Sequence, residues 1–72
     1  MNKEINFHPW RNNVLDFVGQ PLVQIATGQQ VVVAQNMRGQ FMIYVAGALV
    51  EDGLDNIEAS SVLNRMGCSV PA

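Results

Sequence analysis

Ten consecutive residues decide the fold of this chain: Phe41-Met42-Ile43-Tyr44-Val45-Ala46-Gly47-Ala48-Leu49-Val50, a run without a charge, an amide side chain or a proline. A second apolar run, Val31-Val32-Val33-Ala34, lies shortly before it. Strands that are apolar on both faces must be covered on both faces. A chain of 72 residues has few residues left to cover both faces of such a sheet. The two runs therefore predict a β-sheet that needs a partner.

The composition predicts one small domain that is marginal on its own. A chain of this length buries only about 60% of its unfolded surface, so such domains usually gain support from disulfides, metals or oligomerisation. A single cysteine, Cys68, rules out an internal disulfide. One histidine and one cysteine are too few for a four-ligand zinc site, and we expect no cofactor. Oligomerisation or a partner protein is the remaining source of support.

Charge and polarity favour contact with protein over contact with nucleic acid. The net charge is −2, and the four positive residues are scattered along the chain. Nucleic-acid affinity rests on clustered Lys and Arg contacts with phosphates, so we expect no conventional nucleic-acid surface. Only 14% of the residues are charged, and the polar surface consists largely of Gln and Asn. Neutral amides do not repel one another, which suits close association; compositional drift is the alternative explanation.

Neither a membrane segment nor a secretory leader is predicted. The apolar run over 41–50 is shorter than the roughly 20 residues that a membrane-spanning helix needs. The N-terminus lacks a basic region followed by an apolar region. We therefore expect a cytoplasmic protein without a membrane partner.

The predicted fold class is α+β, a single domain over 1–72 with the order α-β-β-β-α and a three-stranded antiparallel meander. The predicted elements are a helix over 9–18, strands over 22–26, 30–35 and 40–46, and a helix over 56–66, with loose termini at 1–8 and 68–72. Residues 48–50 would continue the third strand beyond a bend at Gly47, and 51–53 would form a turn.

Spacing and capping signals define the two helices. Pro9 suits the first turn of a helix, and Trp10, Val14, Phe17 and Val18 fall on one helical face. A strand is the alternative for this segment. In the second helix, Asp55 and Glu58 predict a capping box. Ala59, Val62, Leu63 and Met66 share one face, and Gly67 suits the C-cap.

The loop lengths predict which side chains share a face of the sheet. A four-residue loop over 36–39, with Gly39 in the left-handed conformation, would pair Gln35 with Gln40 and Val32 with Ile43. One face is then entirely apolar: Val23, Ile25, Val32, Ala34, Phe41, Ile43 and Val45. The other face is mostly apolar: Leu22, Gln24, Ala26, Val31, Val33, Met42, Tyr44 and Ala46.

A protein-binding surface is predicted on the second face. If both helices cover the first face, the second is an exposed apolar patch of about 400 Å² or more, which solvent rarely meets in monomers. The candidate binding residues are Gln24, Val31, Val33, Met42 and Tyr44. The alternative is that one helix covers each face and no patch exists.

Other candidate sites have mainly structural explanations. A secondary acidic patch of Glu51, Asp52, Asp55 and Glu58 either is a solvated turn and helix start or docks on a basic partner. Its spacing does not match a calcium loop. Cys68 and His8 would form a nucleophile pair only if a third group oriented them. We therefore expect no catalytic residues and a non-enzymatic protein.

The predicted α-β-β-β-α order resembles the double-stranded RNA-binding domain. That family uses a basic cluster at the start of its second helix to grip phosphates, whereas the corresponding segment here, 51–58, is acidic. The expected function is a protein-binding module that acts as a homodimer, or as a subunit or inhibitor of a larger assembly. Its size is typical of a phage accessory protein directed at a host factor. The alternatives are a nucleic-acid-associated protein on an RNA-binding-like scaffold and a small-ligand-binding domain.

Overall fold

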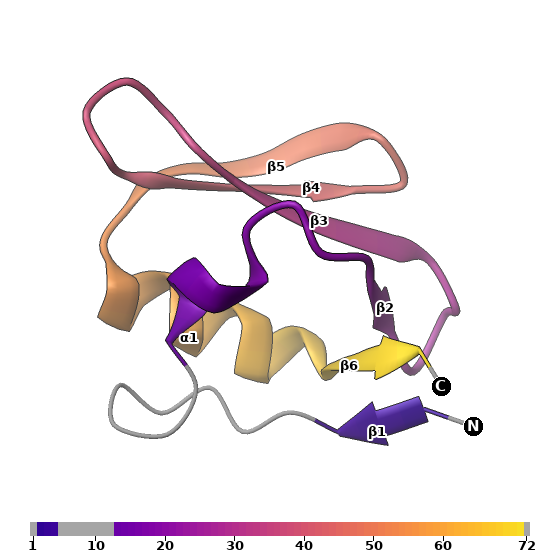
Figure 1. The fold of residues 1–72 in the computed structure, drawn as a ribbon. Coiled ribbons are helices and arrows are strands. Elements are labelled where there is room, and N and C mark those ends of the chain that lie inside the picture. Colours follow the sequence, from indigo (N-terminus) through magenta and orange to yellow (C-terminus); the bar gives the residue numbers. More distant parts are fainter. Residues whose placement is uncertain (1, 5–12, 72) are drawn as a thin grey trace.

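A sheet curls around one α-helix in the computed structural model, which describes residues 2–4 and 13–71 (Figure 1). The described elements are β1 (Asn2–Glu4), the 3₁₀ helix η1 (Val14–Phe17), β2 (Leu22–Gln24), β3 (Gln30–Gln35), β4 (Phe41–Val45), β5 (Ala48–Leu54), α1 (Asn56–Met66) and β6 (Cys68–Pro71). Over these residues the strands form one sheet in the order β1-β6-β2-β3-β4-β5, with antiparallel neighbours throughout. The predicted α+β class is confirmed.

The predicted α-β-β-β-α order is wrong, because the described residues form additional strands. The three predicted strands are present as β2, β3 and β4, but β5 extends their meander and β6 pairs with β2 on the other side. β1 in turn pairs with β6, with Lys3 opposite Val70. The described part of the chain therefore lacks the order on which the resemblance to the double-stranded RNA-binding domain rested.

The first predicted helix is much shorter in its described part. Residues 9–12 of the predicted helix lie outside the described residues, and Val14–Phe17 form a 3₁₀ turn. The Asn13 side chain caps this turn by accepting a hydrogen bond from the Leu15 N–H. After this turn the backbone becomes extended, because Val18 and Gly19 pair with β3. Gly19 donates its N–H to the Val33 carbonyl at 3.0 Å, and Val18 forms an isolated β-bridge with Val33. Pairing with the sheet thus ends the helix.

The first and third predicted strands are shorter than expected at their ends. β2 stops at Gln24 because the Gln24 carbonyl accepts hydrogen bonds from the Thr27 and Gly28 N–H groups, at 3.3 and 2.7 Å. The turn therefore begins earlier than the predicted 27–29. β3 has the predicted bounds, and β4 loses one residue at each end of the predicted 40–46.

The register of the β3–β4 hairpin differs from the prediction by one residue. Gln35 pairs with Phe41, and Val33 pairs with Ile43. The cause is Gln40, whose N–H donates to the Asn36 side chain and whose carbonyl accepts from the Asn36 N–H. Only three residues remain in the loop, and the left-handed Gly39 closes it as predicted. A one-residue slip exchanges the faces of β3, so Val31 and Val33 face the core.

A two-residue turn splits the decisive apolar run into two strands. Ala46 and Gly47 both have positive φ, 51° and 83°, as a type I′ hairpin turn requires. Residues 48–50 therefore begin β5 and do not continue β4. The predicted turn over 51–53 is also wrong: it lies within β5, where the pairing with β4 shifts register twice. These shifts are β-bulges, which let a strand bend without ending it.

The second predicted helix is confirmed residue for residue. α1 spans Asn56–Met66, the Asp55 and Glu58 side chains form the capping box, and Gly67 closes the helix with φ 67°. The tail after it was predicted to be loose, but Cys68–Pro71 form β6. The Gly67 carbonyl accepts a hydrogen bond from the Ile25 N–H at 3.0 Å, which brings the chain from the helix directly alongside β2.

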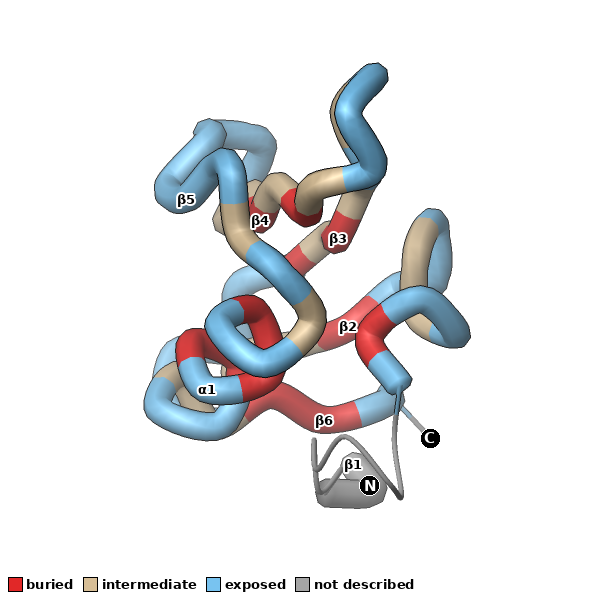
Figure 2. The backbone as a smooth tube through the Cα atoms, turned by 90° about the vertical axis from the view of Figure 1, so that its left-hand side faces the viewer, coloured by how far each residue is buried: buried red, intermediate tan, exposed pale blue. Residues whose placement is uncertain are grey.

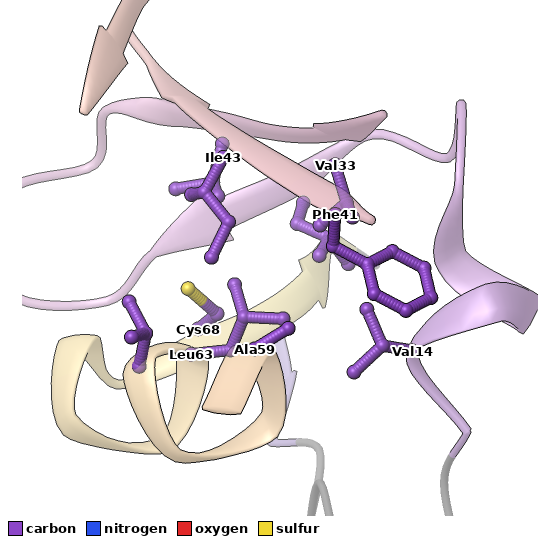
Figure 3. Packing of buried hydrophobic residues seen from close by; sticks show 10 residues of the cluster. Val14, Val33, Phe41, Ile43, Ala59, Leu63 and Cys68 are labelled. Carbon is purple, nitrogen blue, oxygen red and sulfur yellow. The ribbon is translucent and has the colours of Figure 1, made fainter. Parts of the chain in front are cut away.

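The core lies between the concave face of the sheet and the two helical elements. Figure 2 shows β2 to β6 curving around α1, with the buried residues on the inner side. The buried apolar residues are Val14, Leu22, Val31, Val33, Phe41, Ile43, Ala59, Val62, Leu63 and Cys68. Figure 3 shows Val14 from η1 beside the Phe41 ring, and Leu63 and Ala59 from α1 beneath Ile43. Both helical elements therefore cover the same face of the sheet.

Candidate protein-binding surface

The five predicted binding residues fall on two different faces of the sheet. Val31 and Val33 are fully buried in the core, and Gln24 lies on the same inner side because it alternates with Val23 along β2. Met42 and Tyr44 alternate with the buried Phe41 and Ile43, so they lie on the outer side. The structure does not bring the five together, because the one-residue register shift exchanged the faces of β3.

The outer face is nevertheless apolar. Tyr44 pairs with Val32 on one side and with Leu49 on the other, and Met42 pairs with Ala34. Four of these side chains are half-buried, and Leu49 is 50% exposed. None of the five carries a charge. Since η1 and α1 both lie on the inner side, neither helical element of the described residues covers this face (Figure 1).

The residues of the acidic patch have distinct local roles. Asp55 and Glu58 complete the capping box, where each side chain accepts a backbone N–H, at 2.7 and 3.1 Å. Asp52 accepts hydrogen bonds from the Gly53 N–H at 2.7 Å and from the Asn36 side chain at 3.4 Å. Glu51 is exposed on β5. Three of the four acidic residues therefore hold local structure: Asp55 and Glu58 at the helix start, and Asp52 within β5.

Cys68 is a core residue with a protonated thiol. Its side chain is 2% exposed and belongs to the cluster beneath Ile43 (Figure 3). Burial removes the thiolate from water and raises the pKa of Cys68 from 9.0 to about 11. A neutral thiol is a poor nucleophile at physiological pH. His8, the other residue considered for a nucleophile pair, lies outside the described residues.

The described part of the chain carries neither a metal cluster nor a membrane-spanning helix. No group of three or more His, Cys, Asp or Glu side chains there is arranged to hold a metal ion. No helix of that part has the length and apolar character needed to cross a membrane.

Comparisons of the chain with protein-family models, with curated proteins and with solved structures found no match in any of the three.

The strand β5 is the feature that sequence reasoning missed. Glycine or asparagine normally marks the first position of a type I′ turn, because φ is positive there. Ala46 occupies that position with φ 51°, so the sequence carries only Gly47 as a signal. Recognising the turn would have placed Leu49 beside Tyr44 on the outer face. Glu51 lies opposite Ile43 because the pairing shifts register between Ile43 and Tyr44, which the turn alone does not reveal.

Proposed function

We propose that the protein is a binding module that forms a homodimer through its outer sheet face, made of Val32, Ala34, Met42, Tyr44 and Leu49. The observation that carries this proposal is the apolar surface of three neighbouring strands that neither helical element of the described residues covers. Solvent-exposed apolar patches on small domains typically mark contact surfaces. Tyr and Met are also enriched at the centres of protein interfaces.

The absence of charge on this face favours a second copy of the chain as the occupant. A two-fold interface brings the same patch of both subunits together, so any charge near the axis meets its own copy. The five residues of the outer face are all uncharged, and Gln30 continues the same side of β3 with a neutral amide. Dimerisation would also support a domain of marginal size.

Sedimentation velocity of the full chain tests the proposal. A face this small gives a weak dimer, so we expect the monomer–dimer transition between about 10 µM and about 1 mM. Tyr44→Glu places two like charges at the interface and should weaken the dimer at least about tenfold. Leu49→Lys should have the same effect at a more exposed position, where the fold tolerates substitution.

Met37→Glu is the matched control, because Met37 is a fully exposed apolar residue at the hairpin tip, away from the outer face. It should dimerise like the wild type. A wild-type chain that stays monomeric over the whole concentration range contradicts the proposal. So does a dimer that Tyr44→Glu and Leu49→Lys leave intact while circular dichroism shows both variants folded.

A further inference from the structure

A groove runs along the other side of β5, between this strand and α1. One part of it has a volume of about 450 Å³ and is lined by Val50 and Glu51 from β5, by Val62, Arg65 and Met66 from α1, and by Gln24 and Val45. A second hollow of about 390 Å³ continues along the same two elements. The two hollows share Glu51, Val62 and Arg65, so they form one continuous groove.

One wall of this groove is an open edge of the sheet. β5 is the last strand in the sheet order and pairs only with β4 among the described strands. Val45 and Ala48 flank a two-residue turn, and such residues exchange both hydrogen bonds of their pair. The next residue, Leu49, therefore directs its N–H and C=O away from β4. These groups are available to one more strand.

Both walls offer apolar contact beside that edge. Ile57, at the first turn of α1, is 66% exposed and lines the groove, and Val50 on β5 is 49% exposed. Ser61 lies one helical turn beyond Ile57 and leaves room between the two walls. A strand that pairs with β5 would direct every second side chain toward α1, against these residues.

The charges of the groove favour a basic segment of a partner protein over a second copy of the chain. Glu51 and Glu58 line it, with Asp52 and Asp55 at the same end of β5, and Arg65 is the one cation among the lining residues. Antiparallel pairing of β5 with a second copy along the whole strand would bring Glu51 opposite its own copy, and like charges on facing strands destabilise a sheet. An extended segment with Lys or Arg between apolar residues avoids this repulsion.

We propose that the β5–α1 groove binds an extended, basic and apolar segment of a partner protein, which adds to the free edge of β5 as an antiparallel strand. The main-chain groups of Leu49 supply hydrogen bonds, the apolar wall receives alternate side chains, and Glu51 and Glu58 bind the positive charges. Strand addition of this kind takes its affinity from the main chain and its specificity from the side-chain pockets.

A selection with displayed peptides tests the proposal directly, because it needs no identified partner. A library of random twelve-residue peptides on yeast is selected for binding to the full chain. We expect enrichment of sequences that alternate β-branched residues with Lys or Arg. The best peptide, made synthetically, should protect the Leu49 amide from hydrogen exchange and should bind more weakly as salt rises.

Two groove variants and one control make the test specific. Glu51→Lys reverses an exposed groove charge, and Ser61→Trp fills the gap between the walls; each should weaken peptide binding at least about tenfold. Asp16→Lys makes the same charge change on η1, at a residue that lines neither hollow of the groove, and should leave binding unchanged. Tyr44→Glu should also leave binding unchanged, which separates this site from the dimer face.

Three results would overturn the proposal. One is a selection that enriches no peptide. Another is a selected peptide that binds the folded Glu51→Lys and Ser61→Trp variants as tightly as the wild type. The third is a bound peptide that leaves the Leu49 amide as exchangeable as in the free protein.

Discussion

The Asn56 side chain ties η1 to the start of α1: its Oδ1 accepts a hydrogen bond of 3.2 Å from the Val14 N–H, across 42 residues of the chain. Val14 is fully buried and packs beside Phe41 (Figure 3). This hydrogen bond and this apolar contact help to hold the segment before β2 on the core, together with the pairing of Val18 and Gly19 with Val33. Both helical elements of the described residues thus lie on the inner face, and neither covers the outer face.

Asn56→Ala is expected to lower the free energy of unfolding by about 1 kcal/mol, because the Val14 N–H loses its acceptor in a partly buried place. Asn56→Asp keeps the acceptor and adds a negative charge at the helix start, where the dipole favours it. In urea unfolding, the Asn56→Asp variant should therefore have a free energy of unfolding equal to or higher than that of the wild type. Equal losses in both variants would show that the amide nitrogen, and not Oδ1, is important.

Two buried serines should respond differently to replacement by alanine. The Ser69 Oγ is buried without a hydrogen-bond partner among the described residues, so Ser69→Ala should raise the free energy of unfolding by about 1 kcal/mol. The Ser60 Oγ donates to the Asn56 carbonyl at 2.7 Å. Ser60→Ala loses about 1 kcal/mol with that bond and regains about 0.5 kcal/mol in helix propensity, so the net change should be small.

Thermal unfolding measured on both variants checks this contrast. A Ser69→Ala protein that melts below the wild type would mean that the hydroxyl has a partner, and the assignment of Ser69 as unsatisfied would be wrong.

The stability of the protein should fall between about pH 9 and about pH 11. Burial raises the pKa of Cys68 from 9.0 to about 11, so the unfolded chain loses the thiol proton at a lower pH than the folded protein. Where the unfolded state binds fewer protons, the free energy of unfolding decreases as pH rises. Below pH 9 the thiol is protonated in both states and contributes no pH dependence.

Urea unfolding at several pH values, with Cys68→Ala as the reference, isolates this contribution, because all other groups titrate in both proteins. The difference in unfolding free energy between the two proteins should shrink as pH rises through this range. A difference that stays constant would show that the thiol is not desolvated in the folded protein.

Local signals in the sequence predicted part of the fold to the residue. The residues that begin and end α1 lie next to the helix itself: Asp55 and Glu58 form the capping box, and Gly67 is the C-cap. A short stretch of sequence was therefore sufficient to predict its bounds. β6 depends instead on pairing with β2, which lies more than 40 residues earlier in the chain. No local pattern over 68–71 indicates that partner.

The candidate surface was predicted only in part, for a related reason. Met42 and Tyr44 were assigned to an apolar face opposite the helices, and they lie on the side of the sheet that neither helical element of the described residues covers. Val31 and Val33 were assigned to the same face because the loop was counted as four residues. The Asn36 side chain accepts hydrogen bonds from the Arg38 and Gln40 N–H groups. Gln40 therefore pairs with Asn36 at the end of the hairpin, and the register shifts by one residue. Loop composition alone does not reveal this choice.

Two neighbouring valines give a direct test of that register. Val33 is fully buried opposite Ile43, whereas Val32 is half-buried on the outer face opposite Tyr44. Val33→Ala should lower the free energy of unfolding by about 2 kcal/mol, from lost burial and the cavity that remains. Val32→Ala should cost less than about 1 kcal/mol in the monomer. Both variants lose the same β-branched side chain from the same strand, so β-propensity cancels in the comparison. Urea unfolding at low protein concentration avoids any contribution from association. If Val32→Ala lowers the free energy of unfolding more than Val33→Ala does, the register with Val33 opposite Ile43 is wrong. Val32 would then pair with Ile43, and Val33 would lie on the outer face with Tyr44.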